Sequence, residues 1–204
     1  MPSPAQFLPA ILATVAVVLG LFTAAWLFAP DGTPQLESGT LLQQPRALPA
    51  FQFQSSDGQP FTPERLQQRW TLIFPGFTYC PDICPTTLTQ LKQLHALTGR
   101  RAQIVLLSVD PARDTPQRLA EYLAFFDPDF IGVTAPEPEL GRLTQALGIA
   151  YIQVPGAGGQ DYSLDHSAAL VLINPQGRIA GYFMPPFRLD QLAADLNHLF
   201  GSRS

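Results

Sequence analysis

The sequence predicts an α/β domain built on a mostly parallel sheet, and two features of residues 50–204 carry this prediction. Short apolar runs of strand length alternate with segments of helix length between residues 70 and 154. Such alternation is typical of parallel strands joined by helical crossovers, with both faces of the sheet covered. After residue 166 the pattern changes to two apolar runs around a turn at residues 174–177, which predicts an antiparallel hairpin.

The first 30 residues differ from the rest of the chain because they carry no charged side chain. All 12 Lys and Arg residues and all 16 Asp and Glu residues follow position 30. At about 1.5 Å per residue, the apolar run over residues 7–29 can cross the roughly 30 Å hydrocarbon core of a bilayer as a helix. A cleaved signal peptide is the alternative, but its apolar core would be shorter, and Leu27-Phe28-Ala29-Pro30 is a poor cleavage site. We therefore expect a short cytoplasmic N-terminus over residues 1–6 and a transmembrane anchor over residues 7–29.

A change of composition after the apolar run separates a tether from a domain. Residues 30–49 are rich in Pro, Gly, Gln and Ser without an apolar period, which predicts a flexible tether. Residues 50–204 are then the folded domain. Its opening alternates Phe and Gln, turns at Asp57-Gly58 and predicts an N-terminal hairpin, followed by a short helix that begins at Pro63.

The elements of the domain core follow in a regular order. Strands are expected at residues 70–77, 104–110, 130–134 and 151–154, and helices at residues 85–98, 116–126 and 137–147. The Gly-rich residues 156–166 predict a loop, residues 167–183 predict two strands, and leucines spaced on one face predict a last helix from residue 189. This layout is that of a thioredoxin-like domain. Pro75 lacks an N–H donor, so we expect the first core strand to end early or to bulge.

Both cysteines of the chain lie in the stretch FTYCPDICPTTL, with three residues between them. A strand leads into this stretch and a helix follows it, so Cys80 is predicted in a loop and Cys84 at a helix start. This edge of a parallel sheet is where ligand sites gather, and free N–H groups at a helix start favour thiolate over thiol. Because a chain of this length folds without a covalent staple, an inert disulfide is the weaker interpretation. A redox couple and part of a metal site both stay open.

Of the three histidines, His166 is the candidate to complete a site. It precedes an apolar strand that we expect beside the strand leading to Cys80, whereas His95 and His198 fall inside helices and are interpreted as packed or solvated. The alternative for His166 is a loop histidine bonded to its neighbour Asp165. Two thiolates and one imidazole suit copper, since three ligands are enough for Cu(I) and structural zinc would need a fourth.

Two acidic side chains are candidates for supporting this site. Asp110 follows the second core strand and opens onto the same edge of the sheet, where it can orient His166 or contact a partner. Asp165 is the sequence neighbour of His166. We expect Asp114 or Thr115 to cap the next helix, which Pro116 opens.

Three stretches of the chain resemble the Sco/SenC family of copper chaperones of cytochrome c oxidase assembly. They are FTYCPDICPTTL, LSVDPARDTPQRLAEYLAFFDPDFIGVT and DYSLDHSAALVLINPQGRIAGYF. The resemblance implies a bacterial inner-membrane protein whose thioredoxin-like domain lies in the periplasm and binds one copper ion through Cys80, Cys84 and His166. It implies delivery of Cu(I), with Cu(II) as a second state, to the dinuclear copper centre of cytochrome c oxidase subunit II. A copper donor and a thiol reductant are the other implied partners.

Two classes of function remain after this comparison. The first is a metal-binding assembly factor that is not an enzyme. The second is a thiol-disulfide oxidoreductase, or a peroxidase, in which Cys80 attacks, Cys84 resolves and the two form a redox-active disulfide. Oxidoreductases of this fold usually have a two-residue spacer and a cis-proline where His166 stands, so the metal interpretation is favoured. A formal net charge of -4 with scattered basic residues excludes nucleic acid as a partner.

Overall fold

The structure, a computed structural model, describes residues 8–27, 35–156 and 162–201. The chain divides into two compact units, residues 1–33 and residues 34–204. The first unit contains the helix α1 (Leu8–Leu27). No helix within the described ranges is long and apolar enough to count as a membrane span. The anchor expected over residues 7–29 is therefore not supported by the structure.

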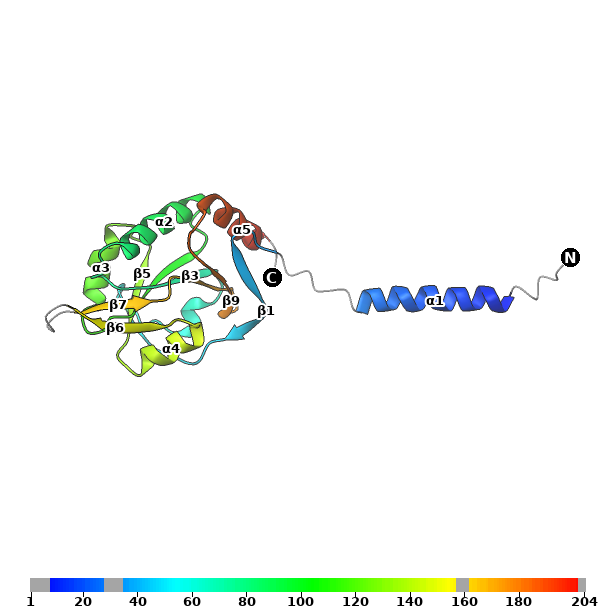
Figure 1. Ribbon diagram of the computed structural model, residues 1–204, viewed down its shortest axis with the longest axis horizontal. Helices are drawn as coiled ribbons and strands as arrows, with labels where there is room; N and C mark the ends of the chain where they lie inside the picture. The colour runs from blue at the N-terminus through cyan, green and yellow to red at the C-terminus, as the bar shows by residue number, and fades with distance from the viewer. Residues whose placement is uncertain (1–7, 28–34, 157–161, 202–204) are drawn as a thin grey trace. The chain divides into compact units, whose positions relative to one another are not determined.

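The second unit is a mixed α/β domain whose elements follow one another largely as the sequence predicts (Figure 1). Its helices are η2 (Pro63–Leu66, a 3₁₀ helix), α2 (Ile83–Leu97), α3 (Pro116–Ala124), α4 (Glu139–Leu147) and α5 (Leu189–Gly201). Its strands are β1 (Gly39–Ala47), β2 (Gln54–Ser55), β3 (Thr71–Gly76), β4 (Gln103–Ser108), β5 (Ile131–Thr134), β6 (Tyr151–Pro155), β7 (Tyr162–His166), β8 (Leu170–Ile173) and β9 (Arg178–Phe183).

Seven of these strands form one twisted sheet in the order β1-β9-β8-β3-β4-β5-β2. The central strands β3, β4 and β5 are parallel, and β8 pairs with β3 in the antiparallel sense. We expected the strand after His166 to lie beside the strand that leads to Cys80. The pairing of β8 with β3 confirms this. The carboxyl ends of β3 and β4 therefore open onto one edge, beside the start of β8.

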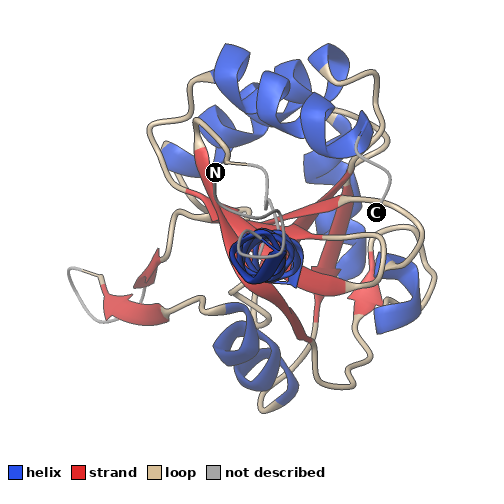
Figure 2. Ribbon diagram, turned by 90° about the vertical axis from the view of Figure 1, so that its right-hand side faces the viewer, coloured by secondary structure: helices blue, strands red, loops and turns tan. Residues whose placement is uncertain are grey.

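Helices cover both faces of the sheet, as Figure 2 shows from the end of the domain. Alternate residues of the central strands point to opposite faces, so Leu72 and Phe74 pack with α2, α3 and α5 while Ile73 packs on the α4 side. Because both faces are buried, the middle of each of these strands is mostly apolar, which is the pattern that identified them in the sequence. The predicted cover on both faces is confirmed, but the predicted parallel arrangement holds only for β3, β4 and β5, because the other pairings of this sheet are antiparallel.

The prediction of a flexible tether over residues 30–49 is wrong for the second half of that range. Strand β1 pairs with β9 at the edge of the sheet, with Gly39 opposite Phe183 and Ala47 opposite Arg178. Its sequence GTLLQQPRA has no clear alternation, because Leu41 and Leu42 pack against opposite core clusters while most of its other side chains are exposed or half-buried. The folded domain therefore begins before residue 50.

The stretch around residue 160 also differs from prediction. Strand β6, expected in the parallel sheet, pairs instead with β7 as a separate two-stranded hairpin. The loop expected over residues 156–166 becomes strand from Tyr162 to His166, while residues 157–161 lie outside the described part of the chain. His166 stands opposite Tyr151 at the domain end of this hairpin.

Strand β3 pairs with β8 on one side and with β4 on the other, and only its pairing with β8 stops before Pro75. The pairing of β3 with β8 runs from Thr71 to Ile73, whereas its pairing with β4 continues through Pro75 to Gly76. The strand therefore does not end before the proline. A missing N–H removes a donor on one side of a strand and leaves the other side intact.

Candidate metal and thiol site

The cysteine loop connects the end of β3 to the start of α2. Cys80 is half-buried within this loop, and Cys84 is buried in the first turn of the helix. The backbone N–H of Cys84 points at Cys80 Sγ, with 3.3 Å between the nitrogen and the sulfur. Both thiols are free. The predicted positions of the two cysteines are confirmed.

Cys84 owes its position to the glycine that ends β3. A Cβ atom on Gly76 would lie 3.2 Å from Cys84 Sγ and 3.0 Å from a methyl group of Leu106, so only glycine leaves room for the sulfur. Burial raises the pKa of the Cys84 thiol, and the neighbouring Cys80 raises it further. The expectation that the helix start favours a thiolate is therefore wrong for Cys84 in the metal-free protein, because desolvation outweighs the helix dipole.

His166 faces the buried thiol across the edge of the sheet. Its Nε2 atom lies 3.7 Å from Cys84 Sγ, and its Nδ1 atom lies 2.8 Å from the carbonyl oxygen of Ser167. A carbonyl only accepts, so Nδ1 carries the proton and the lone pair of Nε2 points toward the sulfur. The ring packs edge-on against Phe77, with 5.9 Å between ring centroids. We expected His166 to lie close to the cysteines, and the structure confirms this for Cys84.

The spacing of these two donors suits a shared metal ion. With bond lengths of about 2.3 Å to sulfur and about 2.0 Å to nitrogen, a trigonal angle of about 120° puts the donors about 3.7 Å apart. In the described part of the chain, no three His, Cys, Asp or Glu side chains already stand close enough to form a complete metal cluster. A three-ligand site therefore needs a change of the Cys80 side chain, which is half-buried and lies in a loop.

Tyr122 provides a second sign that the site is incomplete without a bound group. Its hydroxyl is buried and has no hydrogen-bond partner among the residues that the structure describes. Burial raises the pKa of Tyr122, and negative charge on Cys84 and Cys80 adds to the effect, which places the hydroxyl within electrostatic reach of both sulfurs. A donor in this position can stabilise a thiolate held by a metal.

The two predicted supporting carboxylates do not contact His166. Asp110 is buried and binds Arg113 and the hydroxyl of Tyr162 instead. Asp165 is exposed, because successive side chains of a strand alternate and His166 points inward. Neither carboxylate orients the imidazole directly.

Asp114 supports the cysteine loop, which the sequence interpretation missed. Its buried carboxylate accepts hydrogen bonds from the backbone N–H of Thr78 (3.1 Å), the hydroxyl of Thr78 (2.6 Å) and the hydroxyl of Ser108 (2.6 Å). Thr115 alone caps α3 by accepting from the N–H of Arg118. The prediction that Asp114 or Thr115 caps this helix is therefore confirmed for Thr115, and Asp114 has another role. Spacing alone did not show which of two adjacent capping residues turns inward.

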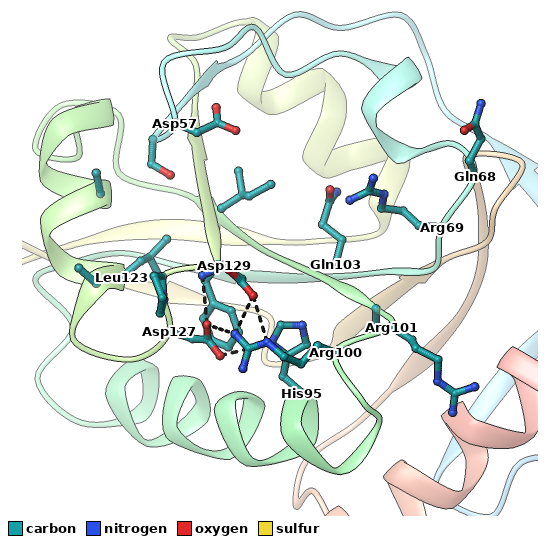
Figure 3. A pocket seen from close by; sticks show the side chains of 17 residues that line it. Asp57, Gln68, Arg69, His95, Arg100, Arg101, Gln103, Leu123, Asp127 and Asp129 are labelled. Atoms are coloured by element: carbon teal, nitrogen blue, oxygen red, sulfur yellow. Dashed lines mark hydrogen bonds and ion pairs between the residues drawn. The ribbon is translucent and has the colours of Figure 1, made fainter.

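The other two histidines lie away from this edge. His95 is buried at the end of α2 with Nδ1 3.3 Å from Asp127, and Arg100 holds the same carboxylate at 2.6 Å. These residues line a pocket of about 720 Å³ at the opposite edge of the sheet (Figure 3). His198 is exposed on α5. None of Cys80, Cys84 and His166 lines this pocket, so it is separate from the cysteine site.

The fold and the site together define a class of protein. A thioredoxin-like domain with two cysteines one helical turn apart, and a histidine facing the second of them, is a thiol protein equipped for metal binding or disulfide exchange. The chain belongs to the SCO1/SenC family, whose sequence profile matches residues 40–201.

Relatives and solved structures agree with this assignment. A protein of Stutzerimonas stutzeri, provisionally named a copper-binding protein, is 44% identical over 182 residues and covers 86% of this chain and 89% of its own. The copper-bound structure of ScoI from Arabidopsis thaliana has a TM-score of 0.72 and 28% identity, over 76% of this chain and 99% of that one. The copper-bound structure of ScoI from Bradyrhizobium japonicum has a TM-score of 0.68 and 32% identity, over 74% and 98%.

Proposed function

We propose that the domain is a copper-binding assembly factor that holds one copper ion through Cys80, Cys84 and His166. The observation that carries the proposal is the 3.7 Å separation of Cys84 Sγ and His166 Nε2, with the Nε2 lone pair directed at the sulfur. Two thiolates and an imidazole are soft enough donors to prefer Cu(I). The copper-bound relatives support the choice of metal.

The proton balance of the site follows from its burial. Because burial raises the pKa of the Cys84 thiol, Cys84 retains its proton at neutral pH in the metal-free protein. Copper binding displaces this proton, while Nδ1 of His166 keeps its proton and continues to donate it to the carbonyl oxygen of Ser167. Cys80 is the more accessible thiol, so an accepting protein reaches the metal from its side. We take the acceptor to be the dinuclear copper centre of cytochrome c oxidase subunit II, as the family resemblance implies.

A His166→Ala variant tests the three-ligand site. Titration of the reduced protein with Cu(I) against a competing chelator is expected to give one equivalent for the parent, and an affinity lower by about 10-fold or more for the variant, because one donor is lost. His198→Ala is the matched control, since that imidazole is exposed on α5. An unchanged affinity in His166→Ala would remove the histidine from the site.

Thiol-disulfide exchange is the second candidate function. The half-buried Cys80 and the buried Cys84 have the unequal accessibility of an attacking and a resolving thiol, and the Cys84 N–H contacts Cys80 Sγ. The reduction of subunit II cysteines would use these two sulfurs. A parent protein that binds no Cu(I) in the titration, yet reduces a disulfide peptide, would favour this function.

We also propose, from the sequence, that the domain faces the periplasm of a bacterial cell from the inner membrane. A membrane-impermeant maleimide added to intact cells is expected to label Cys80, which is half-buried, and not the buried Cys84. Cys80→Ser provides the matched control for the labelled position. Labelling that appears only after cell lysis would refute the periplasmic location.

A further inference from the structure

The β6–β7 hairpin carries His166 but shares no strand pairing with the seven-stranded sheet within the residues that the structure describes. Its attachment to the domain therefore depends on side chains. Leu164 supplies an apolar contact, because it is buried in the core cluster on the α2 side of the sheet. One polar attachment joins Tyr151 of β6 to Glu137, and a second lies at the start of β7, where Tyr162 meets Arg113.

Arg113 makes a two-point contact with the segments on either side of it. Its Nε donates to Asp110 Oδ2 at 2.5 Å, and its Nη1 donates to the carbonyl oxygen of Tyr162 at 3.1 Å. The hydroxyl of Tyr162 closes the ring by donating to Asp110 Oδ1 at 2.7 Å. The planar guanidinium thus ties the loop after β4 to the first residue of β7.

The same guanidinium also reaches the cysteine loop. Its carbon lies 3.8 Å from the ring centroid of Tyr162 and 4.7 Å from that of Tyr79, the residue before Cys80. Arg118 approaches Tyr79 as well, at 4.3 Å from the ring centroid. Three segments that are distant in sequence therefore meet at Arg113: the loop that carries Cys80, the loop after β4 and the strand that carries His166.

We propose that Arg113 is a positioning residue for the metal site, and that it holds the β6–β7 hairpin in the position where His166 faces Cys84. The inference rests on the proposed function, in which both residues bind copper. Arg113 is 18% exposed and its partner Asp110 is 2% exposed, so water does not replace these bonds easily. Cation–aromatic contacts are also stronger at such partly desolvated positions.

The variant Arg113→Lys separates the positioning role of this side chain from the effect of its charge. Arg113→Lys keeps a cation for the buried Asp110 carboxylate, but a single ammonium group can neither stack flat on two rings nor donate along two directions at once. The Cu(I) affinity of the full chain is expected to fall about 10-fold, which is the smaller effect typical of residues that orient a ligand. The matched control is Arg142→Lys, an exposed arginine paired with Glu139 on α4.

A double-mutant cycle with His166→Ala shows whether the effect passes through the histidine. If Arg113 positions His166, Arg113→Lys lowers the Cu(I) affinity of the parent and leaves that of His166→Ala unchanged. An equal loss in both backgrounds overturns the proposal, because it would mean general support of the cysteine loop. The pair Asp110→Asn/Arg113→Gln repeats the cycle without leaving a buried charge unpaired.

The metal-free protein gives an independent measurement. The imidazole nitrogen resonances of His166, assigned by their absence in His166→Ala, are expected to shift or broaden in Arg113→Lys and to stay fixed in Arg142→Lys. Unchanged resonances overturn the proposal whatever the affinity is. If the parent binds no Cu(I), the proposed function fails, and these resonances still decide whether Arg113 positions His166.

Discussion

Replacing Cys84 with alanine is expected to lower the Cu(I) affinity of the reduced protein by at least about 100-fold, since each thiolate contributes roughly 3 kcal/mol to a thiolate metal site. Cys84 is the donor that lies closest to the imidazole of His166, so its loss removes the pair on which the site is built. The measurement is a competition titration with a chromophoric Cu(I) chelator under anaerobic conditions.

The matched control for this variant is Thr87→Ala, which alters another buried residue of α2 without touching a proposed ligand. It is expected to bind copper as the parent does. Oxidation of the parent to a Cys80–Cys84 disulfide is expected to reproduce the loss, and reduction to reverse it, because a disulfide has no thiolate to offer. A Cys84→Ala variant within threefold of the parent affinity would exclude Cys84 as a ligand.

Replacing Asp114 with alanine is expected to destabilise the domain by about 3 kcal/mol, because buried donors of Thr78 and Ser108 lose a charged acceptor. For a domain of this size the loss corresponds to a melting temperature lower by about 9 °C. Differential scanning calorimetry on the metal-free protein measures it. Asp165→Ala is the control, since that carboxylate is exposed, and a comparable loss there would contradict the role assigned to Asp114.

The stability of the domain should also depend on the protonation of Asp114. Burial raises the pKa of this carboxyl, although bonds from Ser108 and Thr78 act in the opposite direction. A folded-state pKa above the unfolded value of about 3.9 means that the folded protein binds the proton more tightly. The contribution of this group therefore falls as the pH rises from about 4 through the folded-state pKa. Asp114→Asn is expected to flatten the pH profile in that range.

Elements with a strong apolar pattern could be predicted from the sequence. The middle of each central strand is mostly apolar because both faces are covered, and α2 to α5 begin and end within a few residues of the expected positions. Strand β1 could not be predicted, because its backbone pairs with β9 while its side chains remain partly exposed. Strand β7 did carry a signal, since Tyr162, Leu164 and His166 alternate with Ser163 and Asp165, but the preceding glycines favoured a loop interpretation.

In the candidate site, too, some residues could be predicted from the sequence and others could not. Cys80, Cys84 and His166 have side chains whose chemistry is distinctive, so residue type and approximate topology were enough to select them. Asp110 and Asp114 are carboxylates four residues apart in one loop, and their roles depend on which way each side chain turns. Arg113 acts through its contacts with Tyr79 and Tyr162, and no spacing rule relates those positions. Long-range partners of this kind are set by packing.

The independence of the β6–β7 hairpin has a consequence for the order in which the protein matures. The seven-stranded ladder can be completed without any hydrogen bond to this hairpin, in the part of the chain that the structure covers. Pairing of the main sheet therefore does not by itself bring His166 to Cys84. The candidate ligand set is complete only once side-chain contacts of the hairpin, such as those of Leu164 and Arg113, have formed.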